Sequence, residues 1–385
     1  MCEKANAPKM STEEKKDKPT TTKVKEHEFG SDGCTYEVLE AGGKVRCLTC
    51  AHECVIAPGG SGICAVRKNE GGRLRLVVYG SANCVNARDP IEKKPLYHVM
   101  AGSRTFSMAT VGCNFACEFC QNDDLSQCTK DLKRRLLAEG NPDLLDVEVG
   151  ALGYRLSPRE LVAKAVASGC RIVAYTYSEP TIFFEYAIDT ARLAHEHGLL
   201  NVFKSNGFES ARTVERMVGL IDAANIDLKS FSDAFYRNVC HARLQPVLDT
   251  IRRLHAAGIW TEVTTLIVPG ENDSDDELRA IAQFIASVDA NIPWHVTQFH
   301  PAYHMTDKHR TPIASVERAY AIGKKAGLNF VYGRSGDQSC TFCSNCGQKL
   351  IQREGFFGAE IIPSAFADGK CKKCSTPLPG IWKLP

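Results

Sequence analysis

Cys113, Cys117 and Cys120 form a Cys-x3-Cys-x2-Cys set that could bind a metal cluster with one open position. A zinc site or an ordinary iron–sulfur cluster takes four protein ligands. With three thiolates and no obvious fourth, a cuboidal [4Fe–4S] cluster would keep one iron free for a small molecule. The amino and carboxylate groups of S-adenosylmethionine (SAM) are a bidentate pair that could chelate that iron. A zinc site completed by Cys128 is the competing interpretation.

Two further cysteine sets are each complete, with four thiols. The downstream set consists of two Cys-x2-Cys pairs next to glycines and predicts a zinc ribbon: Cys343, Cys346, Cys371 and Cys374. The upstream set lies in a glycine-rich segment: Cys47, Cys50, Cys54 and Cys64. For this set we favour tetrahedral zinc, with an auxiliary iron–sulfur cluster as the alternative. The central triplet is therefore the incomplete set.

The composition of the 385 residues indicates in what kind of protein these metal sites occur. The formal net charge of +2 shows no broad field that would demand nucleic acid or a membrane. Residues 1–33 mix charges with Pro and Thr and predict a disordered tail. No apolar run resembles a secretory signal or a membrane span, so we expect a cytoplasmic protein whose cysteines are metal ligands. The sequence does not indicate an oligomeric state.

Apolar strand-like runs alternate with helical segments from about Arg104 onward. The predicted strands are Thr105–Thr110, Arg171–Thr176, Leu199–Lys204, Asp222–Leu228, Ile259–Val268 and Trp294–Phe299. The predicted helices are Pro158–Ser168, Thr181–His197, Pro246–Ala257, Ser274–Ala286 and Val316–Ala326. This α/β pattern predicts a parallel sheet, either an open (βα)6 barrel or a doubly wound sheet. Both architectures place the active site at the carboxyl ends of the strands.

The pattern also predicts the domain organisation. We expect a metal module and connector over 34–98, the catalytic core over 99–334, and the ribbon module over 335–385. The charged stretch from Lys130 to Arg155 interrupts the alternation of strands and helices. We interpret it as an insertion near the cluster mouth, more typical of a solvated loop than of a lid or a partner-binding segment.

The triplet resembles the signature of the radical SAM superfamily: a Cys-x3-Cys-x2-Cys loop after an apolar strand, with an aromatic residue, Phe119, before the last cysteine. The resemblance implies a partial (βα)6 barrel in which a reduced [4Fe–4S] cluster cleaves SAM. The 5′-deoxyadenosyl radical that is released would abstract hydrogen from a substrate. The hard chemistry would belong to the cofactors, while the protein positions them. The resemblance also implies an electron donor of the flavodoxin or ferredoxin type.

Polar residues at successive strand ends extend the resemblance. Members often carry Gly-Gly-Glu-Pro after the second strand; this chain keeps Glu179 and Pro180 but has Tyr177 and Ser178 in place of the glycines. The resemblance implies that Glu179 binds the methionine amino group, although an acid at a helix start also serves as a cap.

The next two strands end in Ser205-Asn206-Gly-Phe and Asp227-Leu-Lys229, similar to Thr-Asn-Gly-Phe and Asp-Leu-Lys of pyruvate formate-lyase activating enzymes. The resemblance implies that Ser205 or Asn206, together with Asp227 and Lys229, contacts the ribose and the carboxylate of SAM.

Three histidines are weaker candidates. His300, at the end of the sixth strand, could bind cofactor or shuttle a proton, or be held structurally by hydrogen bonds; His304 is weaker still. For His98, which follows Asp89-Pro-Ile-Glu-Lys-Lys-Pro, we expect a packed or capping role. This element, the upstream cysteines and the terminal ribbon are together similar to the radical SAM enzyme of the AmmeMemoRadiSam system, over roughly residues 44–383.

The substrate is open among three hypotheses. Analogy with activating enzymes predicts abstraction of hydrogen from a glycine of a partner protein. The ribbon is also compatible with docking onto RNA that the enzyme would tailor. From a different class, the chain could be a zinc-bound interaction protein that has lost catalysis. Fold-level analogy does not decide among them.

Overall fold

The computed structural model describes residues 24–25, 35–39, 42–333 and 336–384. Apart from the two-residue strand β1 (Val24–Lys25), the predicted tail over 1–33 lies outside the described residues. None of the helices in the described part of the chain is long and apolar enough to cross a membrane.

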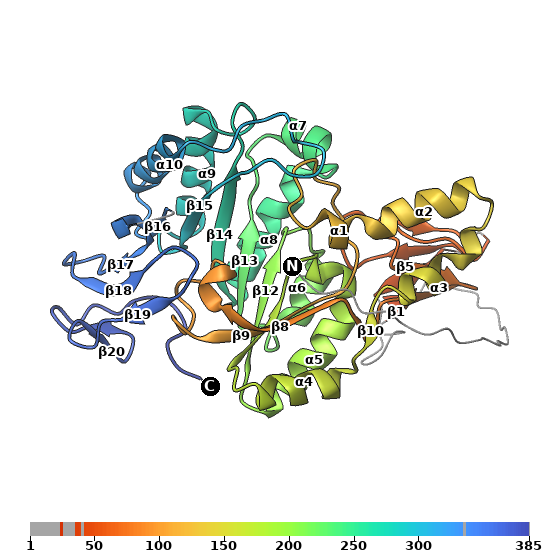
Figure 1. Cartoon of the computed structure of the whole chain (residues 1–385), viewed down its shortest axis with the longest axis horizontal. Coiled ribbons are helices and arrows are strands. Elements are labelled where there is room, and N and C mark those ends of the chain that lie inside the picture. The colour runs from red at the N-terminus through yellow and green to blue at the C-terminus, as the bar shows by residue number, and fades with distance from the viewer. Residues whose placement is uncertain (1–23, 26–34, 40–41, 334–335, 385) are drawn as a thin grey trace.

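One eight-stranded sheet forms the centre of the molecule (Figure 1). All six predicted strands are confirmed within two residues at each end, and they pair in parallel in chain order. Two more strands were not predicted: β8, antiparallel to β9 at one edge, and the short β16, parallel to β15 at the other. In sheet order the strands are β16 (Val331–Tyr332), β15 (Trp294–Gln298), β14 (Trp260–Ile267), β13 (Ala223–Asp227), β12 (Leu200–Ser205), β11 (Ile172–Tyr175), β9 (Arg104–Ala109) and β8 (Cys84–Pro90).

The strand order decides between the two predicted architectures. From β9 to β16 the parallel strands follow one another in sequence with no reversal. Right-handed crossovers that always step in the same direction put every connecting helix on the same face of the sheet. A doubly wound sheet needs a reversal, so that alternative is wrong. The chain has the α/β fold of an open, partial barrel.

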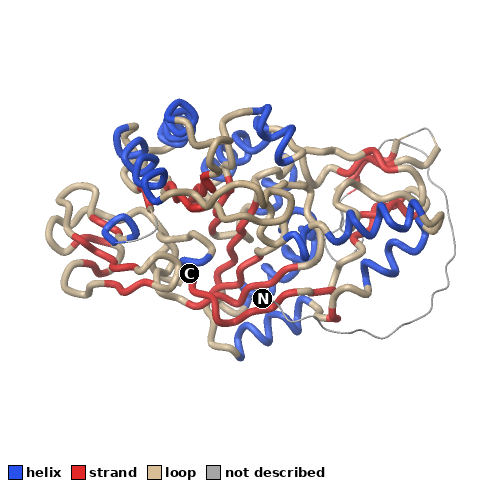
Figure 2. Tube along the Cα trace, turned by 45° about the horizontal axis from the view of Figure 1, so that its top comes forward, coloured by secondary structure: helices blue, strands red, loops and turns tan. Residues whose placement is uncertain are grey.

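The connecting helices begin and end close to the predicted positions. α4 begins after Ser157, whose side chain and that of Glu160 cap one another's backbone N–H groups in a capping box. Three short helices were not predicted: α6, α7 and a π-helix. The turn Pro180–Phe183 before α5 is a 3₁₀-helix. Figure 2 shows the helices around the strands. They are α4 (Pro158–Ala167), α5 (Phe184–Glu196), α6 (Ala211–Met217), α7 (Asp233–Phe235), a π-helix (Tyr236–Cys240), α8 (Leu244–Ala256), α9 (Asp275–Val288) and α10 (Ile313–Lys325).

The stretch from Lys130 to Arg155, predicted to be a solvated loop, is helical instead. α1 (Asp123–Ser126) leads into α2 (Cys128–Ala138), and α3 (Leu145–Gly150) follows a 3₁₀-turn. Leu136, Leu145 and Val149 are buried and join the main hydrophobic cluster. The prediction failed because the charged residues between these apolar positions hid a narrow packing face.

Two small β modules lie at opposite ends of the long axis (Figure 1). The N-terminal strands are β2 (Tyr36–Val38), β3 (Val45–Cys47), β4 (Val55–Ile56), β5 (Arg67–Glu70), β6 (Arg73–Leu76) and β7 (Ser81–Ala82). The C-terminal strands are β17 (Thr341–Phe342), β18 (Lys349–Arg353), β19 (Ala359–Ile361), β20 (Phe366–Ala367) and β21 (Lys370–Cys371). β7 pairs with β10 (Tyr154–Arg155), and β8, within the predicted N-terminal module, extends the central sheet. The predicted boundaries themselves stay predictions.

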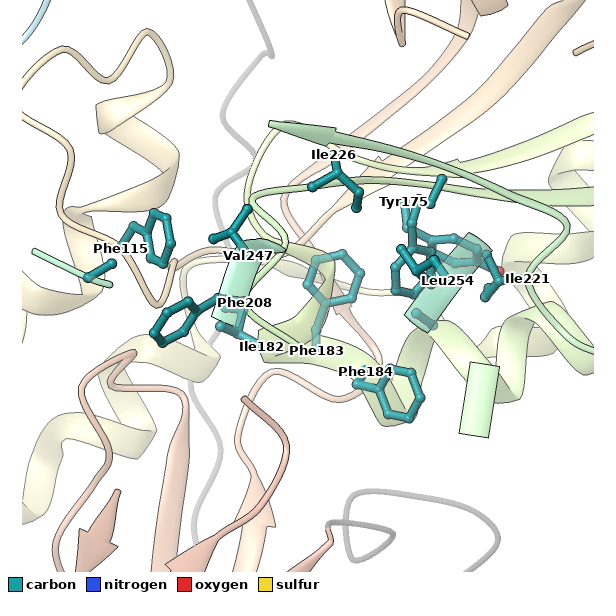
Figure 3. Packing of buried hydrophobic residues seen from close by; sticks show 14 of the residues in the cluster. Phe115, Tyr175, Ile182, Phe183, Phe184, Phe208, Ile221, Ile226, Val247 and Leu254 are labelled. Carbon is teal, nitrogen blue, oxygen red and sulfur yellow. The ribbon is translucent and has the colours of Figure 1, made fainter. Parts of the chain in front are cut away.

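The core connects the triplet to the barrel wall. Phe115, which lies between two of the triplet cysteines, packs edge-on against Phe208 with ring centroids 5.1 Å apart. Figure 3 shows these rings beside Val247 and Ile182, within the same cluster of buried residues. The cysteine loop is therefore anchored by apolar packing to the segment that follows β12.

Candidate active site

The loop that carries the triplet follows β9, and Gly112 is the residue before the first of its cysteines. Gly112 has φ +100°, and a Cβ there would lie 3.0 Å from Val66 Cγ1 and 3.2 Å from the carbonyl oxygen of Cys64. Only glycine fits this conformation and this close approach. Farther along, the amides of Ala116 and Glu118 donate to the carbonyls of Cys240 and Val239, at 3.1 and 3.0 Å. The loop is thus held at both ends.

The sulfur positions of the triplet differ from those of a single-ion site. Around tetrahedral zinc, with Zn–S near 2.3 Å, neighbouring sulfurs lie about 3.8 Å apart. Among the described residues, the C-terminal cysteines are the one ligand set whose atoms all lie within 4.8 Å of one another, and the triplet does not meet this limit. Wider spacing suits thiolates that bind different irons of one cluster.

Cys128, the fourth ligand of the competing zinc interpretation, begins helix α2. Its thiol donates to the carbonyl of Leu125 at 3.3 Å, so it is engaged with the preceding short helix, α1. The triplet sulfurs have other neighbours: the Phe115 amide donates to Cys113 Sγ at 3.3 Å, and Cys120 Sγ lies 3.1 Å from Ser126 Oγ. Nothing here supports Cys128 as a ligand.

Cys240 is a neighbour of the triplet that the sequence analysis missed. It is fully buried at the end of the π-helix. Its hydrogen bond with Cys117, together with burial, raises the pKa of the Cys117 thiol well above the usual range. Because Cys240 lies 120 residues from the triplet, no spacing rule could have found it.

Glu179 connects the ends of two neighbouring strands. It is buried and accepts hydrogen bonds from Thr181 Oγ1 at 2.6 Å, Ser205 Oγ at 2.9 Å and the Asn206 amide at 2.8 Å. It also caps the 3₁₀-turn through the Thr181 amide, at 3.0 Å. Burial raises the pKa of the Glu179 carboxyl. The expected capping contact is present, and the carboxylate lies where two strand ends meet.

Glu209, a second buried carboxyl, was not predicted. The Ser205 hydroxyl lies 2.6 Å from Glu209 Oε1 as well as 2.9 Å from Glu179 Oε1. One hydroxyl proton can be donated to only one of these oxygens at a time. Burial, followed by the charge of Glu179, raises the pKa of Glu209 to about 7. The two carboxyls therefore titrate as a pair.

Asn206 reaches from the end of β12 to the triplet. Its Nδ2 atom lies 3.8 Å from Cys113 Sγ and donates to Asn114 Oδ1 at 2.7 Å. Its amide is bound to Glu179, so one residue links the cysteine loop with two strand ends.

Asp227 and Lys229 lie together with a third residue that we did not predict, Lys204. Lys229 Nζ is 3.1 Å from Asp227 Oδ2, and Lys204 donates to Asp227 Oδ1 and, at 2.8 Å, to Asn225. Burial alone would raise the pKa of Asp227, but the two ammonium groups lower it to about 2. Asp227 therefore stays ionised. The three charged side chains Lys204, Lys229 and Asp227 together carry a net charge of +1.

Tyr177, which stands where relatives often have glycine, keeps a backbone conformation that favours glycine. Its φ is +64°. The hydroxyl donates to Asp89, Lys94 Nζ lies 4.2 Å from the ring centroid, and Asn122 donates to the Tyr177 carbonyl at 3.0 Å. These contacts offset the cost of a left-handed tyrosine. The replacement thus preserves the turn.

Three other predicted residues, Phe119, His300 and His304, differ in how far they are buried. Phe119 is buried against Phe235, and Lys229 Nζ is 5.7 Å from its ring. His300 is exposed, with Nδ1 3.3 Å from Gln121 Nε2, beside the triplet. His304 is exposed, and its amide donates to the Glu118 carbonyl.

His98 is packed, as expected, and lies toward the C-terminal module. Its ring nitrogens contact the Pro379 carbonyl and the Tyr332 hydroxyl, both at 2.6 Å. Burial lowers the pKa of His98 to about 4.

The C-terminal cysteines form a group that could hold a metal ion. The Sγ atoms of Cys343 and Cys374 are 3.5 Å apart, and those of Cys346 and Cys371 are 3.6 Å apart. These distances are close to those around a tetrahedral ion. The hydrogen bond with the Thr376 hydroxyl lowers the pKa of the Cys374 thiol to about 6, which favours the thiolate that a metal binds.

A family comparison agrees with this geometry. Residues 108–285, from the end of β9 to α9, match the model of the Radical SAM superfamily. The chain belongs to this superfamily and is an enzyme of the radical SAM type. The family implies a [4Fe–4S] cluster and SAM as cofactors.

Relatives extend the likeness over more of the chain. An "Uncharacterized protein MJ0808" of Methanocaldococcus jannaschii is 39% identical over 346 residues, covering 88% of this chain and 96% of that protein. The benzylsuccinate synthase activating enzyme of Thauera aromatica is 24% identical over 141 residues, covering 35% of this chain and 43% of that enzyme. Among solved structures, a radical SAM methyltransferase from Sphaerobacter thermophilus is 15% identical with a TM-score of 0.45, covering 64% of this chain and 70% of that chain.

Proposed function

We propose that the triplet holds a [4Fe–4S] cluster, that the strand ends beside it bind SAM, and that the enzyme abstracts hydrogen from a macromolecule. When bound, the cluster supplies the electron that cleaves SAM to methionine and a 5′-deoxyadenosyl radical. The observation that carries the proposal is the position of Asn206, bound to Glu179 through its amide and 3.8 Å from Cys113 through its side chain. It brings the cysteine loop and the predicted cofactor residues to one place.

The donors present fit a cluster with one open position. The three sulfurs are free thiols, spaced more widely than around one ion. Cys117 is buried, and Cys113 and Cys120 are partly buried beside the buried polar residues Asn114 and Ser126.

Each strand end has a chemical role that its charge allows. In this proposal the Glu179 carboxylate accepts hydrogen bonds from the methionine amino group, and Glu209 takes up or gives off a proton as that cation binds. Lys229 pairs with the methionine carboxylate, and the permanently ionised Asp227 accepts hydrogen bonds from the ribose. Ser205 and Asn206 orient Glu179.

For the substrate we favour a glycine residue of a partner protein. The similarity to an enzyme named as the activating enzyme of benzylsuccinate synthase supports this choice, since that name denotes an enzyme that acts on another enzyme. The proposal includes a flavodoxin- or ferredoxin-type electron donor, zinc in the C-terminal cysteine group, and a cytoplasmic location.

The catalytic part is tested by cofactor content and product together. After anaerobic reconstitution, Cys113→Ala should contain about four fewer irons per chain than the unchanged protein and form no 5′-deoxyadenosine on reduction with SAM. The matched control is Cys240→Ser, which should keep its iron because Cys240 is a neighbour of the cluster and not a ligand. Unchanged iron content in Cys113→Ala would refute the proposal.

The substrate is tested by following deuterium. The reduced enzyme and SAM are incubated with protein from the source cells labelled with [2,2-²H]glycine, or with RNA from the same cells carrying deuterated ribose and bases. Deuterium in 5′-deoxyadenosine from the protein sample alone is expected. Transfer from the RNA sample alone would reject a glycine substrate in favour of RNA tailoring.

A further inference from the structure

The face of the central sheet away from the connecting helices is the inner wall of the partial barrel and surrounds its lumen. Along a strand, successive side chains point to opposite faces. In β11, Val173 and Tyr175 pack in the large hydrophobic cluster together with the helices. Ile172 and Ala174 pack in a separate, smaller cluster, so they point into the lumen. Ser107, on neighbouring β9, is paired with Ala174 and points into the lumen as well.

The lumen has an apolar floor and a polar upper part. Ile91, Leu96 and Val99, from the segment between β8 and β9, pack against the lumen-facing apolar residues of β11, β12 and β13 and close the deep end. By the same alternation, Lys204 and Asp227 point into the lumen nearer the carboxyl ends of their strands. Their side chains are 19% and 27% exposed. The upper part of the lumen, beside the proposed SAM site, is therefore open to solvent.

Tyr177 places its side chain in this lumen. Its hydroxyl donates to Asp89 and also interacts with Ser107, whose side chain points into the lumen. Its ring covers the buried Lys94, with Nζ 4.2 Å from the ring centroid. Tyr177 itself is only half-buried, so part of its side chain faces open space. The ring therefore forms one wall of the upper lumen.

This ring is held in place from both ends of the residue. Asn122, just after the triplet, donates to the Tyr177 carbonyl at 3.0 Å, while Asp89 accepts from the hydroxyl. Asp89 is fixed in turn by Lys94 and Lys93, with Nζ–O distances of 2.7 and 2.9 Å. Burial alone would raise the pKa of Asp89, but Lys94, followed by the other donors, lowers it to about 2. A side chain that is fixed in this way defines the shape of the space beside it.

Tyr177 occupies this place against the preference of its own backbone. Its φ of +64° is a left-handed conformation that glycine adopts without steric cost. Strained residues that are held by their surroundings are typical of functional sites. A glycine here would leave open the part of the lumen that the ring now fills. The tyrosine therefore reduces the space for a substrate beside the proposed SAM site.

We propose that Tyr177 determines substrate specificity: its ring narrows the lumen so that the α-carbon of a glycine can enter, while residues with a side chain are kept out. This inference rests on the proposed function, in which hydrogen is taken from a glycine of a partner protein. A hydrogen atom with its one electron moves from the α-carbon to C5′ of the 5′-deoxyadenosyl radical. One C–H bond breaks, one C–H bond of 5′-deoxyadenosine forms, and the unpaired electron remains on the α-carbon.

The test compares two small models of an interior residue, N-acetyl-[2,2-²H]glycinamide and racemic N-acetyl-[2-²H]alaninamide. The full-length protein, reconstituted with iron and sulfide, is reduced with dithionite in the presence of SAM and one probe. Mass spectrometry gives the deuterium per 5′-deoxyadenosine formed, a ratio that does not depend on how fast SAM is cleaved. We expect about tenfold or more transfer from the glycine probe relative to the alanine probe, since one methyl group excluded from a tight space has an effect of this size. In Tyr177→Gly the two probes should differ by less than about threefold.

Tyr177→Phe is the matched control, because it keeps the ring and removes only the hydroxyl. It should still favour the glycine probe at least about fivefold. Equal transfer from both probes in the unchanged protein, an unchanged ratio in Tyr177→Gly, or no transfer from the glycine probe in either protein would each overturn the proposal. If Tyr177→Gly misfolds, Tyr177→Asn takes its place with the same expected result, because asparagine tolerates a left-handed backbone.

Binding of the probes is measured separately, without turnover. In the oxidised protein with SAM bound, no electron is available for cleavage, and NMR titration gives the Kd of each unlabelled probe. The alanine probe should bind about tenfold or more weakly than the glycine probe in the unchanged protein, and within about threefold of it in Tyr177→Gly. Equal Kd values in the unchanged protein would overturn the inference.

This inference and the proposed function can fail separately. Absence of 5′-deoxyadenosine from the reduced protein with SAM would reject the proposed function. Formation of 5′-deoxyadenosine without a preference between the two probes would reject the role of Tyr177 alone.

Discussion

At the scale of residues, the site is characterised by buried charged side chains. The pair Glu179 and Glu209 shares one serine hydroxyl, while Asp227 is held between two lysines. The first arrangement makes a proton easy to exchange near neutral pH, and the second makes a charge permanent. The site therefore combines one adjustable and one fixed negative charge.

Replacing Glu209 with glutamine should remove a pH dependence of stability. Native Glu209 keeps its proton up to a pKa of about 7, whereas the unfolded chain loses it near 4.5. Between these values the native state binds more protons, so its stability falls as pH rises, by up to about 3 kcal/mol. In Glu209→Gln the free energy of unfolding from urea titrations should vary less between pH 5 and 8. An unchanged profile would show that Glu209 ionises normally.

The sequence indicated some of these residues and not others, for physical reasons. Glu179, Asp227 and Lys229 sit at strand ends, where the order of strands along the chain already predicts that they converge. Lys204 lies within a strand, and Cys240 lies in an irregular helix far from the triplet. Their proximity to the site comes from tertiary packing, which has no local pattern.

At the scale of elements, the turn after β12 is fitted to one residue type. Gly207 has φ +76°, and a Cβ there would lie 2.6 Å from Ile226 Cγ2 and 3.0 Å from Val247 Cγ1. This turn carries Ser205 and Asn206 into the site. The geometry of the turn, and with it the position of Asn206 near Cys113, depends on residue 207 being a glycine without a Cβ.

Gly207→Ala should lower both stability and SAM binding. The left-handed backbone costs about 1–2 kcal/mol for alanine, and the overlap with β13 and α8 adds about 1–3 kcal/mol. Gly258→Ala is the matched control, because Gly258 has φ +77° with nothing within 4 Å of a Cβ, so only the first cost applies. Urea unfolding and SAM titration would measure both. Equal effects of the two substitutions would contradict the packing argument.

The six predicted strands were found because buried parallel strands are continuous apolar runs. The segments that failed, α2 and α3, bury only a few apolar residues among many charges. Edge strand β8 has a mixed sequence, and its pairing depends on the neighbouring β9. Elements with one narrow packing face are the ones that sequence periodicity predicts least well.

At the scale of the whole molecule, a buried arginine ties the C-terminal module to the core. Arg353, on β18, donates to the Tyr97 carbonyl at 2.6 Å and lies 3.7 Å from Glu92 Oε1, with both side chains inaccessible to solvent. Its guanidinium also covers the Tyr97 ring at 4.4 Å. The two parts therefore fold as neighbours with a shared charge pair.

Arg353→Met should destabilise the protein by about 3–5 kcal/mol, because it leaves Glu92 buried without a cation. Adding Glu92→Gln should recover part of that loss, since the uncompensated charge is then removed. Urea unfolding gives both values, and proteolysis should cleave the C-terminal module first in the single variant. Loss of stability without any recovery in the double variant would mean that the arginine acts by packing alone.

The unjoined edges of the central sheet have a consequence for substrate entry. Strands β8 and β16 are the two ends of the sheet order, and within the described residues they do not pair with each other. A closed barrel admits a polymer only end-on, by threading a terminus. A barrel with a free seam can take a hairpin or loop from the side while both flanking segments stay outside. An interior residue of a folded partner, and not just its tail, is thus a permissible target.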